Sequence, residues 1–208
     1  MWQPSLEFWF EFASPYSYVA AMQIEELCKT SGVALTWVPF QLGPIFAQQG
    51  WNTSHFNLNP WRGTYMWRDM ERLTAISALP WRRPTEFPRK SVLASRIAAA
   101  HADKPWIGRY VRGIFIANFG NDSSIEDRDV VMAVLRDAGA DPDNAIAIAV
   151  EAPLRSRLRA NTERALSLGI FGAPNCVVDG ELFWGEETLQ DAVAWALACT
   201  QSNKARIS

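Results

Sequence analysis

Two serines stand where an aromatic stretch runs into a helix start, and their position suits the binding of an anion. Ser14 follows the stretch 6–12, and Pro15 and Tyr16 separate it from Ser17. Ser14 is a good N-cap residue, and Pro15 suits the first helical position because its missing N–H would have no partner there. The free amides and partial positive charge of a helix N-terminus attract anions, including thiolates. The candidate site therefore begins at Ser14.

The Ser14 hydroxyl cannot exchange disulfides, but it can stabilise a thiolate that belongs to another molecule. A hydrogen bond to sulfur favours the charged form of a thiol, whose ordinary pKa is about 8.5. The alternative, in which Ser14 only caps the helix, is equally compatible with the residues alone.

Two later segments carry further candidates. Pro174 lies between the Gly172 turn and a strand pattern that begins at residue 175. A cis bond here would point the backbone of Ala173 towards the first helix start, whereas a trans proline at a strand edge would have no such role. Glu186 and Glu187 open the last helix, where carboxylates complement a helix N-terminus even without a ligand.

The elements that must position these candidates follow an α/β pattern. Stretch 6–12 is apolar on both faces, as expected of a central strand covered on two sides. The helix that begins at Pro15 ends at Gly32, and 33–40 has the composition of a second strand. Strand, helix and strand in so short a span imply a right-handed crossover and parallel pairing.

The middle of the chain is helical, and strands return only near its end. Patterns at 175–178 and 181–184, joined by Asp179-Gly180, predict a hairpin before the last helix. Segment 44–60 has no sustained period, so we expect mostly loop there, with a short turn at 45–47. The predicted helices cover 62–79, 91–102, 105–119, 126–138, a segment capped by Asp141-Pro142, and a longer one broken at Pro153 that reaches Leu168.

Composition excludes several classes of protein. Hydrophobic residues make up 49% and charged residues 20% of the 208, and the net charge is −2. We therefore expect a folded body, with a flexible tail at 201–208 and no nucleic acid or membrane as partner. No stretch approaches about 18 uncharged apolar residues, and the first six residues lack a basic run followed by an apolar core.

The cysteines and histidines give no sign of a disulfide framework or a metal site. The three cysteines are odd in number and widely spaced, which fits a reducing cytoplasm. Cys176 stands two residues after Pro174, but we expect it to be a buried structural thiol. His55 and His101 have no partners at ligand spacing, so no bound metal is predicted.

The order and spacing of these motifs resemble one family. The aromatic strand, Ser-Pro-Tyr-Ser-Tyr at 14–18, Gly-Ala-Pro at 172–174 and the segment 178–185 resemble the 2-hydroxychromene-2-carboxylate isomerases and the kappa-class glutathione transferases, over Leu6 to Ala198. The resemblance implies the thioredoxin-like fold of the disulfide-oxidoreductase A type, a βαβ…ββα sheet with a large all-helical insertion. Residues 1–43 and 170–200 would form the thioredoxin-like domain, and 44–169 would form the insertion with an active-site loop.

The same resemblance implies a glutathione site. Redox members of this fold place Cys-X-X-Cys where this chain has Ser14 and Ser17, so disulfide chemistry is not expected here. Ser14, with Pro15 and Tyr16, would hold the glutathione thiolate. In the family the proline that corresponds to Pro174 is cis, and the residue before it, here Ala173, pairs with the glutathione backbone like an added strand.

The ends of glutathione would be held by residues that depart in part from the family pattern. A polar residue and an Asp hold the γ-glutamyl end, commonly in a Gly-X-Asp-Arg motif, whereas this chain has Glu186, Glu187 and Thr188 after the glycine. Asn52 and Arg62 resemble the family's Asn and basic residue from the loop over the site, and arginine can hold a carboxylate at two points.

The surroundings of Arg62 allow two interpretations. Seven further basic residues make this region locally basic, and a solvated face is favoured over attraction of a substrate carboxylate: Arg68, Arg72, Arg82, Arg83, Arg89, Lys90 and Arg96. Tryptophans cluster there too, and although most belong in a core, they could line a pocket for a flat aromatic substrate: Trp51, Trp61, Trp67 and Trp81.

The resemblance implies a glutathione-dependent cis-trans isomerase that acts on an aromatic carboxylate during ring breakdown, with glutathione as a cofactor that is not consumed. A cytoplasmic homodimer is implied as well. The alternatives are a kappa-like transferase or peroxidase that consumes glutathione, a non-catalytic thioredoxin-like binding domain, and, least favoured by Ser14 and Ser17, a disulfide oxidoreductase.

Overall fold

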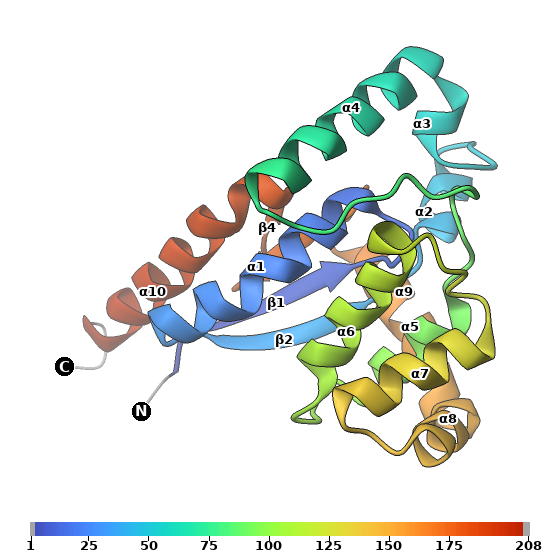
Figure 1. Cartoon of the computed structure of the whole chain (residues 1–208). Coiled ribbons are helices and arrows are strands. Elements are labelled where there is room, and N and C mark those ends of the chain that lie inside the picture. Colours follow the sequence, from blue (N-terminus) through green and yellow to red (C-terminus); the bar gives the residue numbers. More distant parts are fainter. Residues whose placement is uncertain (1–2, 206–208) are drawn as a thin grey trace.

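The structure, a computed structural model, describes residues 3–205, with side chains as far as Thr200. Its centre is a four-stranded sheet in the order β2-β1-β3-β4 (Figure 1). The strands are β1 (Ser5–Phe10), β2 (Ala34–Pro39), β3 (Asn175–Val178) and β4 (Glu181–Trp184). β1 pairs in parallel with β2 and antiparallel with β3, which forms a hairpin with β4. The predicted parallel βαβ unit and late hairpin are therefore confirmed.

Helix α1 (Pro15–Ser31) begins and ends at the predicted residues. The Ser14 side chain accepts the N-cap hydrogen bond, and Gly32 ends the helix at a φ of 69°, a left-handed conformation that glycine adopts without steric cost. The 3-10 turn η3 (Glu186–Thr188) leads into α10 (Leu189–Ala205), which packs beside α1. Because α10 continues to Ala205, helix extends into the segment 201–208 that we predicted to be flexible; residues 206–208 lie outside the described part.

The chain between β2 and β3 is mostly helical, and the prediction of helices was right except in the segment 44–60. Its elements are α2 (Leu42–Gln48), α3 (His55–Leu58), α4 (Pro60–Ile76), α5 (Val92–Ala100), α6 (Ile107–Phe115) with its π-helical continuation η1 (Ile116–Gly120), α7 (Arg128–Ala138), α8 (Pro142–Val150), the 3-10 turn η2 (Leu154–Ser156) and α9 (Arg157–Ser167). The expectation of loop over 44–60 is partly wrong, since α2 and α3 lie there. The first amide of α2, at Leu42, donates to the carboxylate of Glu11, a tertiary contact that periodicity cannot reveal.

Both faces of the sheet are covered, which explains why β1 has large apolar residues on both of its faces. Phe8 and Phe10 pack into the larger core with α1, α6 and α10, while Trp9 packs on the opposite face with Ala165 of α9 and Ile45 of α2. Helix α9 thus covers the sheet, although it belongs to the segment 44–169 that we assigned to the insertion. The division into a thioredoxin-like domain and an insertion stays a prediction.

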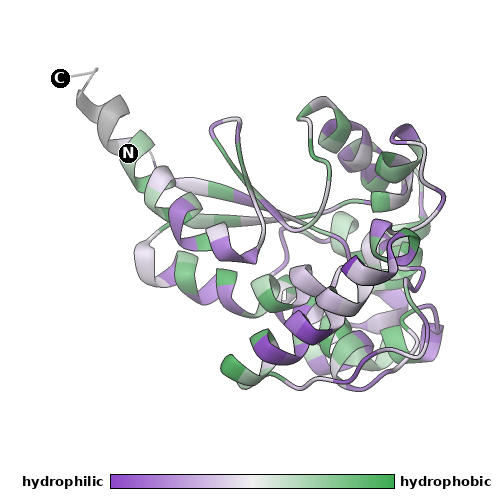
Figure 2. Ribbon diagram, turned by 90° about the horizontal axis from the view of Figure 1, so that it is seen from above, coloured by the Kyte–Doolittle hydropathy of each residue, from purple (hydrophilic) through white to green (hydrophobic). Residues whose placement is uncertain are grey.

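The helices are amphipathic, as expected of helices that bury one face against a sheet and expose the other. Figure 2 shows hydrophobic and hydrophilic residues alternating along most of them. Within residues 3–205 no helix has both the length and the apolar character needed to cross a membrane.

Candidate active site

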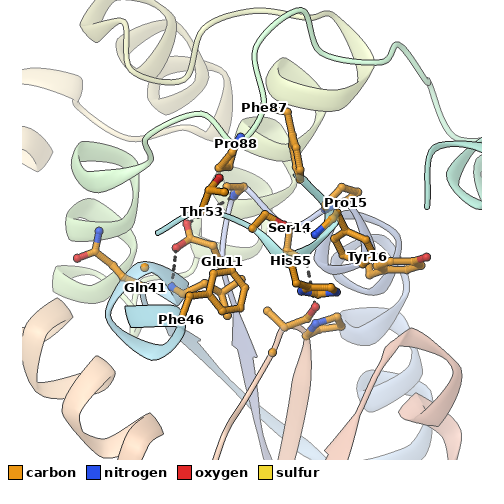
Figure 3. A pocket seen from close by; sticks show the side chains of 18 of the residues that line it. Glu11, Ser14, Pro15, Tyr16, Gln41, Phe46, Thr53, His55, Phe87 and Pro88 are labelled. Atoms are coloured by element: carbon orange, nitrogen blue, oxygen red, sulfur yellow. Dashed lines mark hydrogen bonds between the residues drawn. The ribbon is translucent and has the colours of Figure 1, made fainter. Parts of the chain in front are cut away.

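A cavity of about 790 Å³ opens where β1 and β2 end and α1 begins. Open α/β sheets bind ligands at this edge, outside the carboxyl ends of parallel strands. Its walls come from the start of α1, from α2 to α4, from the segment 87–92 and from the turns on either side of the β3–β4 hairpin (Figure 3). The lining includes all nine residues that the sequence predicted for the site: Ser14, Pro15, Tyr16, Asn52, Arg62, Ala173, Pro174, Glu186 and Glu187.

Ser14 is held at the helix start by two hydrogen bonds. Its Oγ accepts from the amide of Ser17 at 3.2 Å and donates to the carbonyl oxygen of Ala173 at 3.0 Å. The residue is buried but borders the cavity. Within the described residues the amide of Tyr16 donates no hydrogen bond, as is usual in the first turn of a helix. An anion beside Ser14 would therefore meet a free amide and the positive end of the helix dipole, and it would meet the hydroxyl proton once that proton turns away from Ala173.

The segment before β3 places a backbone edge against this helix start. The Ala173–Pro174 bond is cis, as predicted. The carbonyl oxygen of Pro174 accepts from the amide of Gly185 at 3.0 Å, which ties this turn to the end of β4. The carbonyl oxygen of Ala173 faces Ser14, and in the described part of the chain the amide of Ala173 donates no hydrogen bond. A peptide that enters the cavity can pair with this backbone.

Acidic residues form one wall of the cavity near Tyr16. The Tyr16 hydroxyl donates to Asp69 of α4 at 3.1 Å, and burial together with the Asp69 carboxylate raises the pKa of Tyr16 above its ordinary value. Burial also raises the pKa of Glu186 to about 7, and repulsion from Glu187 and Asp69 adds to the shift. We call Asp69, Glu186 and Glu187 the acidic wall; a cation placed there would relieve its mutual repulsion.

Asn52, in the segment between α2 and α3, and Arg62, in the first turn of α4, both belong to the cavity lining. Both side chains are exposed and border the cavity. Three of the seven basic residues nearby pair with carboxylates: Arg68 pairs with Glu71, Arg72 pairs with Asp69, and Arg89 is buried against Asp122. Arg68 and Arg72 agree with the predicted solvated face, whereas Arg89 is buried and does not. Arg62 and Lys90 are the other arginine or lysine residues on the lining.

Glu11 is a cavity residue that the sequence analysis missed. Its buried carboxylate accepts hydrogen bonds from the Ser91 hydroxyl and from the amides of Leu42 and Ala13. Burial raises the pKa of Glu11 above its ordinary value. The side chain thus joins the end of β1 to the first residues of α2 and to the residue before α5. A carboxylate at the end of an otherwise aromatic strand was the available signal.

Aromatic side chains also line the cavity, but among the predicted tryptophans only Trp51 is one of them. Of the four tryptophans singled out, Trp51 alone lines the cavity; Trp67 and Trp81 pack against the core, and Trp61 is 85% exposed. Other aromatic residues and a proline join this lining from segments far apart in the sequence: Phe46, His55, Phe56, Tyr65, Phe87, Pro88 and Trp184. These side chains come together around the cavity because of how α2 to α5 fold over the site. No local sequence pattern specifies that packing.

The cysteines lie away from the cavity. Cys28 and Cys176 are buried and face each other in the core between α1 and β3, and burial raises the pKa of both thiols, that of Cys28 to about 11. No cysteine lies among the cavity residues of the described chain. The prediction of a buried structural thiol at Cys176 is confirmed, and the arrangement offers no thiol pair for disulfide exchange at the helix start.

Comparisons with known proteins agree with this geometry. The chain is 25% identical over 187 residues to a 2-hydroxychromene-2-carboxylate isomerase of Sphingobium xenophagum, covering 89% of this chain and 94% of the relative. It is 26% identical over 181 residues to glutathione S-transferase kappa 1 of Caenorhabditis elegans, covering 82% and 79%. A solved 2-hydroxychromene-2-carboxylate isomerase superposes with a TM-score of 0.82 at 20% identity, over 98% of this chain and 99% of that one.

These similarities confirm the predicted resemblance and the predicted thioredoxin-like fold with its helical insertion, and the relatives named are enzymes. The model of the DSBA-like thioredoxin domain matches residues 5–195. The chain therefore belongs to the DSBA-like thioredoxin domain family.

Proposed function

We propose that this protein is a glutathione-dependent isomerase of the 2-hydroxychromene-2-carboxylate type. One observation carries the proposal: a serine hydroxyl stands at the start of α1, 3.0 Å from the backbone of Ala173, in a cavity that no cysteine of the described chain lines. Such a site has no thiol of its own, yet it offers what a foreign thiolate requires. The similarity to an isomerase and to a kappa-class transferase supports the same reading.

The cavity fits glutathione in size and polarity. Small-molecule sites usually have volumes of about 300–1,000 Å³, and this cavity has about 790 Å³. The backbone of Ala173 offers one acceptor and one donor to a peptide, and the amide of Tyr16 offers a second donor. The acidic wall offers the negative charge that an α-ammonium group needs. Glu187 stands there at the position where the family motif has an Asp.

Each part of the tripeptide then has a partner. Ala173 pairs with the backbone around the cysteine, Ser14 and the start of α1 hold the sulfur, and Glu186 with Glu187 holds the γ-glutamyl ammonium. Arg62 is the candidate for a carboxylate, either of glutathione or of the substrate. As the Ala173 carbonyl accepts a backbone amide from glutathione, the Ser14 hydroxyl becomes available to the sulfur.

When bound, glutathione supplies a sulfur nucleophile that adds reversibly to a conjugated substrate and so permits rotation about a bond. The aromatic wall of Phe46, Trp51 and Phe87 offers flat apolar surface for such a substrate. Lys90 and Arg62 at the lining can attract its carboxylate. Ser14 keeps the sulfur ionised, and the walls exclude water from it.

The test is isomerisation of 2-hydroxychromene-2-carboxylate with and without glutathione. We expect activity only with glutathione, no consumption of it, and a loss of kcat on the order of 100-fold in Ser14→Ala. Equal rates without glutathione, or wild-type rates in Ser14→Ala, would contradict the proposal. Glutathione that fails to raise the thermal stability of the protein would favour a non-catalytic binding domain.

A kappa-like transferase or peroxidase is the second candidate, favoured by the 26% identity to the nematode enzyme. The same site would serve it, because both reactions begin with an ionised glutathione sulfur. Product analysis separates the two: a stable conjugate or oxidised glutathione accumulates only in the second case. The cytoplasmic location and the homodimer that the resemblance implies also belong to this proposal, and fractionation and light scattering test them.

A further inference from the structure

His55, the first residue of α3, presents an imidazole to the same cavity as Ser14. Its ring lies 3.9 Å from the ring of Phe56, 5.7 Å from that of Trp51 and 6.0 Å from that of Phe46, measured between centroids. These contacts come from α2, from α3 and from the segment between them, so they fix the imidazole from several sides. Figure 3 shows His55 and Ser14 around the same hollow.

The two histidines of the chain have different surroundings. His101 is buried away from the cavity, and its Nε2 lies 3.0 Å from the carbonyl oxygen of Ala145. Neither ring nitrogen of His55 takes part in a hydrogen bond with the described residues, although the side chain is half-buried. An imidazole that is held by aromatic packing but has both nitrogens without a partner suits contact with a ligand.

The electrostatic surroundings favour the neutral form of His55. Burial lowers the pKa of His55 from its ordinary value, and the positive charge of Arg62 on α4 lowers it further. On the side of α1, Tyr16 lies beyond Phe56, and its hydroxyl is engaged with Asp69. Arg62 is therefore the charge that acts on His55 in the ligand-free protein, and a neutral imidazole can accept a proton.

We propose that His55 is a catalytic residue that accepts the thiol proton of glutathione bound at Ser14 and returns it when the thiol forms again. This inference rests on the proposed function. In the step, the S–H bond breaks, an N–H bond forms on the imidazole, and the electron pair stays on sulfur. The reverse transfer restores both groups, so no oxidant or reductant is needed. The thiolate and the imidazolium then stabilise each other and titrate as a pair.

The other bases of the cavity are less suited to this transfer. Glu11 already accepts hydrogen bonds from Ser91, Leu42 and Ala13. Asp69 accepts from Tyr16 and pairs with Arg72. Glu186 belongs to the acidic wall, where the proposed function puts the ammonium group. His55 lies on the cavity lining, and within the described residues its ring nitrogens have no hydrogen-bond partner. It is therefore better placed than these carboxylates to accept a proton.

Proton balance on glutathione binding tests the inference. Calorimetry at pH 7.5 in buffers of different ionisation enthalpy gives the protons released, and ultraviolet absorbance gives the thiolate formed. His55→Phe keeps the ring packing and removes the acceptor, while His55→Gln keeps polarity without basicity. In either variant we expect release to rise relative to the wild type by about one proton per thiolate, or the thiolate to be lost. Unchanged thiolate with unchanged release overturns the inference.

The outcomes separate this inference from the proposed function. If glutathione does not bind the wild type, or if Ser14→Ala leaves the thiolate intact, the proposed function itself fails. If glutathione binds and ionises in a Ser14-dependent way while both His55 variants keep the wild-type proton balance, the inference about His55 alone fails. Thermal unfolding of each variant checks that it is folded, and either folded variant decides the question.

Discussion

The hydroxyl of Ser14 donates a hydrogen bond to the carbonyl oxygen of Ala173 over 3.0 Å, although the two residues lie 159 positions apart. This contact joins the start of α1 to the turn before β3, the two backbone segments that would hold the cysteine of glutathione. A backbone amide of a bound peptide can take the place of the Ser14 hydroxyl at the Ala173 oxygen. The Ser14 O–H is then free to donate its hydrogen bond to the ligand. In the proposed function, this arrangement serves a thiol that the chain itself does not supply.

The stability of the helix start should depend on Ser14 and not on Ser17. Ser14→Ala removes the N-cap hydrogen bond to the amide of Ser17 and the bond to Ala173, so we expect the free energy of unfolding to fall by about 1 kcal/mol or somewhat more. Ser17→Ala removes a buried hydroxyl that has no hydrogen-bond partner in the described chain, and should leave stability unchanged or improved. Urea denaturation of both variants measures the difference; a greater loss in Ser17→Ala would speak against this account.

Glutathione affinity should increase with pH because of Glu186. Its pKa in the folded protein is raised to about 7, so the carboxylate that attracts the ammonium group is incomplete below that value. Affinity should therefore fall as pH decreases through about 7. Glu186→Gln should bind more weakly and lose this part of the pH dependence, while the part that comes from ionisation of the bound thiol remains. Calorimetric titrations across the range measure this. An unchanged pH dependence in Glu186→Gln would remove Glu186 from the site.

The same carboxyl predicts the sign of a stability change. Since the folded pKa of Glu186 lies above the ordinary value of 4.5, the folded state binds more protons than the unfolded state between 4.5 and about 7. The contribution of Glu186 to stability is therefore present below pH 4.5 and is lost as pH rises towards 7. Denaturation curves of Glu186→Gln should lack this decline. If the variant shows the same decline, another group causes it.

Glu11 should be necessary for the architecture of the cavity. Glu11→Ala leaves the Leu42 amide and the Ser91 hydroxyl without their acceptor, and each such buried group costs about 1–3 kcal/mol. Glu11→Gln keeps one carbonyl oxygen and should be less destabilised. Because burial raises the pKa of Glu11, the glutamine variant should also be relatively more stable at high pH than at low pH, compared with the wild type. Equal stability of the alanine variant and the wild type would refute the role.

Gly63 should control how closely α3 approaches α4. A Cβ atom at Gly63 would lie 2.5 Å from the carbonyl oxygen of Phe56, which is backbone and cannot rotate away. Gly63→Ala should destabilise the protein by about 1–3 kcal/mol and weaken glutathione binding, because α3 carries His55 and α4 carries Arg62. Gly43 in α2 has no atom near the corresponding position, so the stability of Gly43→Ala should stay equal or rise. Equal stabilities of the two variants would contradict this packing.

The parts of the site that were predictable are those set by short segments. Ser14 and Pro15 mark the start of α1 by local capping chemistry, and the Gly-Ala-Pro turn marks the approach to β3; both lie where the sequence indicated. Glu11 and His55 were missed as site residues, because their places in the cavity depend on contacts with α2, α3 and the segment before α5; the one sequence signal was the carboxylate of Glu11 after an aromatic strand. The same contacts explain why α2 escaped detection: its first amide is satisfied by Glu11, which is distant in sequence.

The central claim is that the start of α1 keeps a foreign sulfur ionised through Ser14, and the pKa of the bound glutathione thiol tests it most directly. Ultraviolet absorbance of the thiolate, titrated against pH with glutathione at saturation, should give a pKa below the ordinary value of about 8.5 for the wild type and for Ser17→Ala. Ser14→Ala should return it towards that value. An unshifted pKa in the wild type, or the same shifted pKa in Ser14→Ala, would contradict the account.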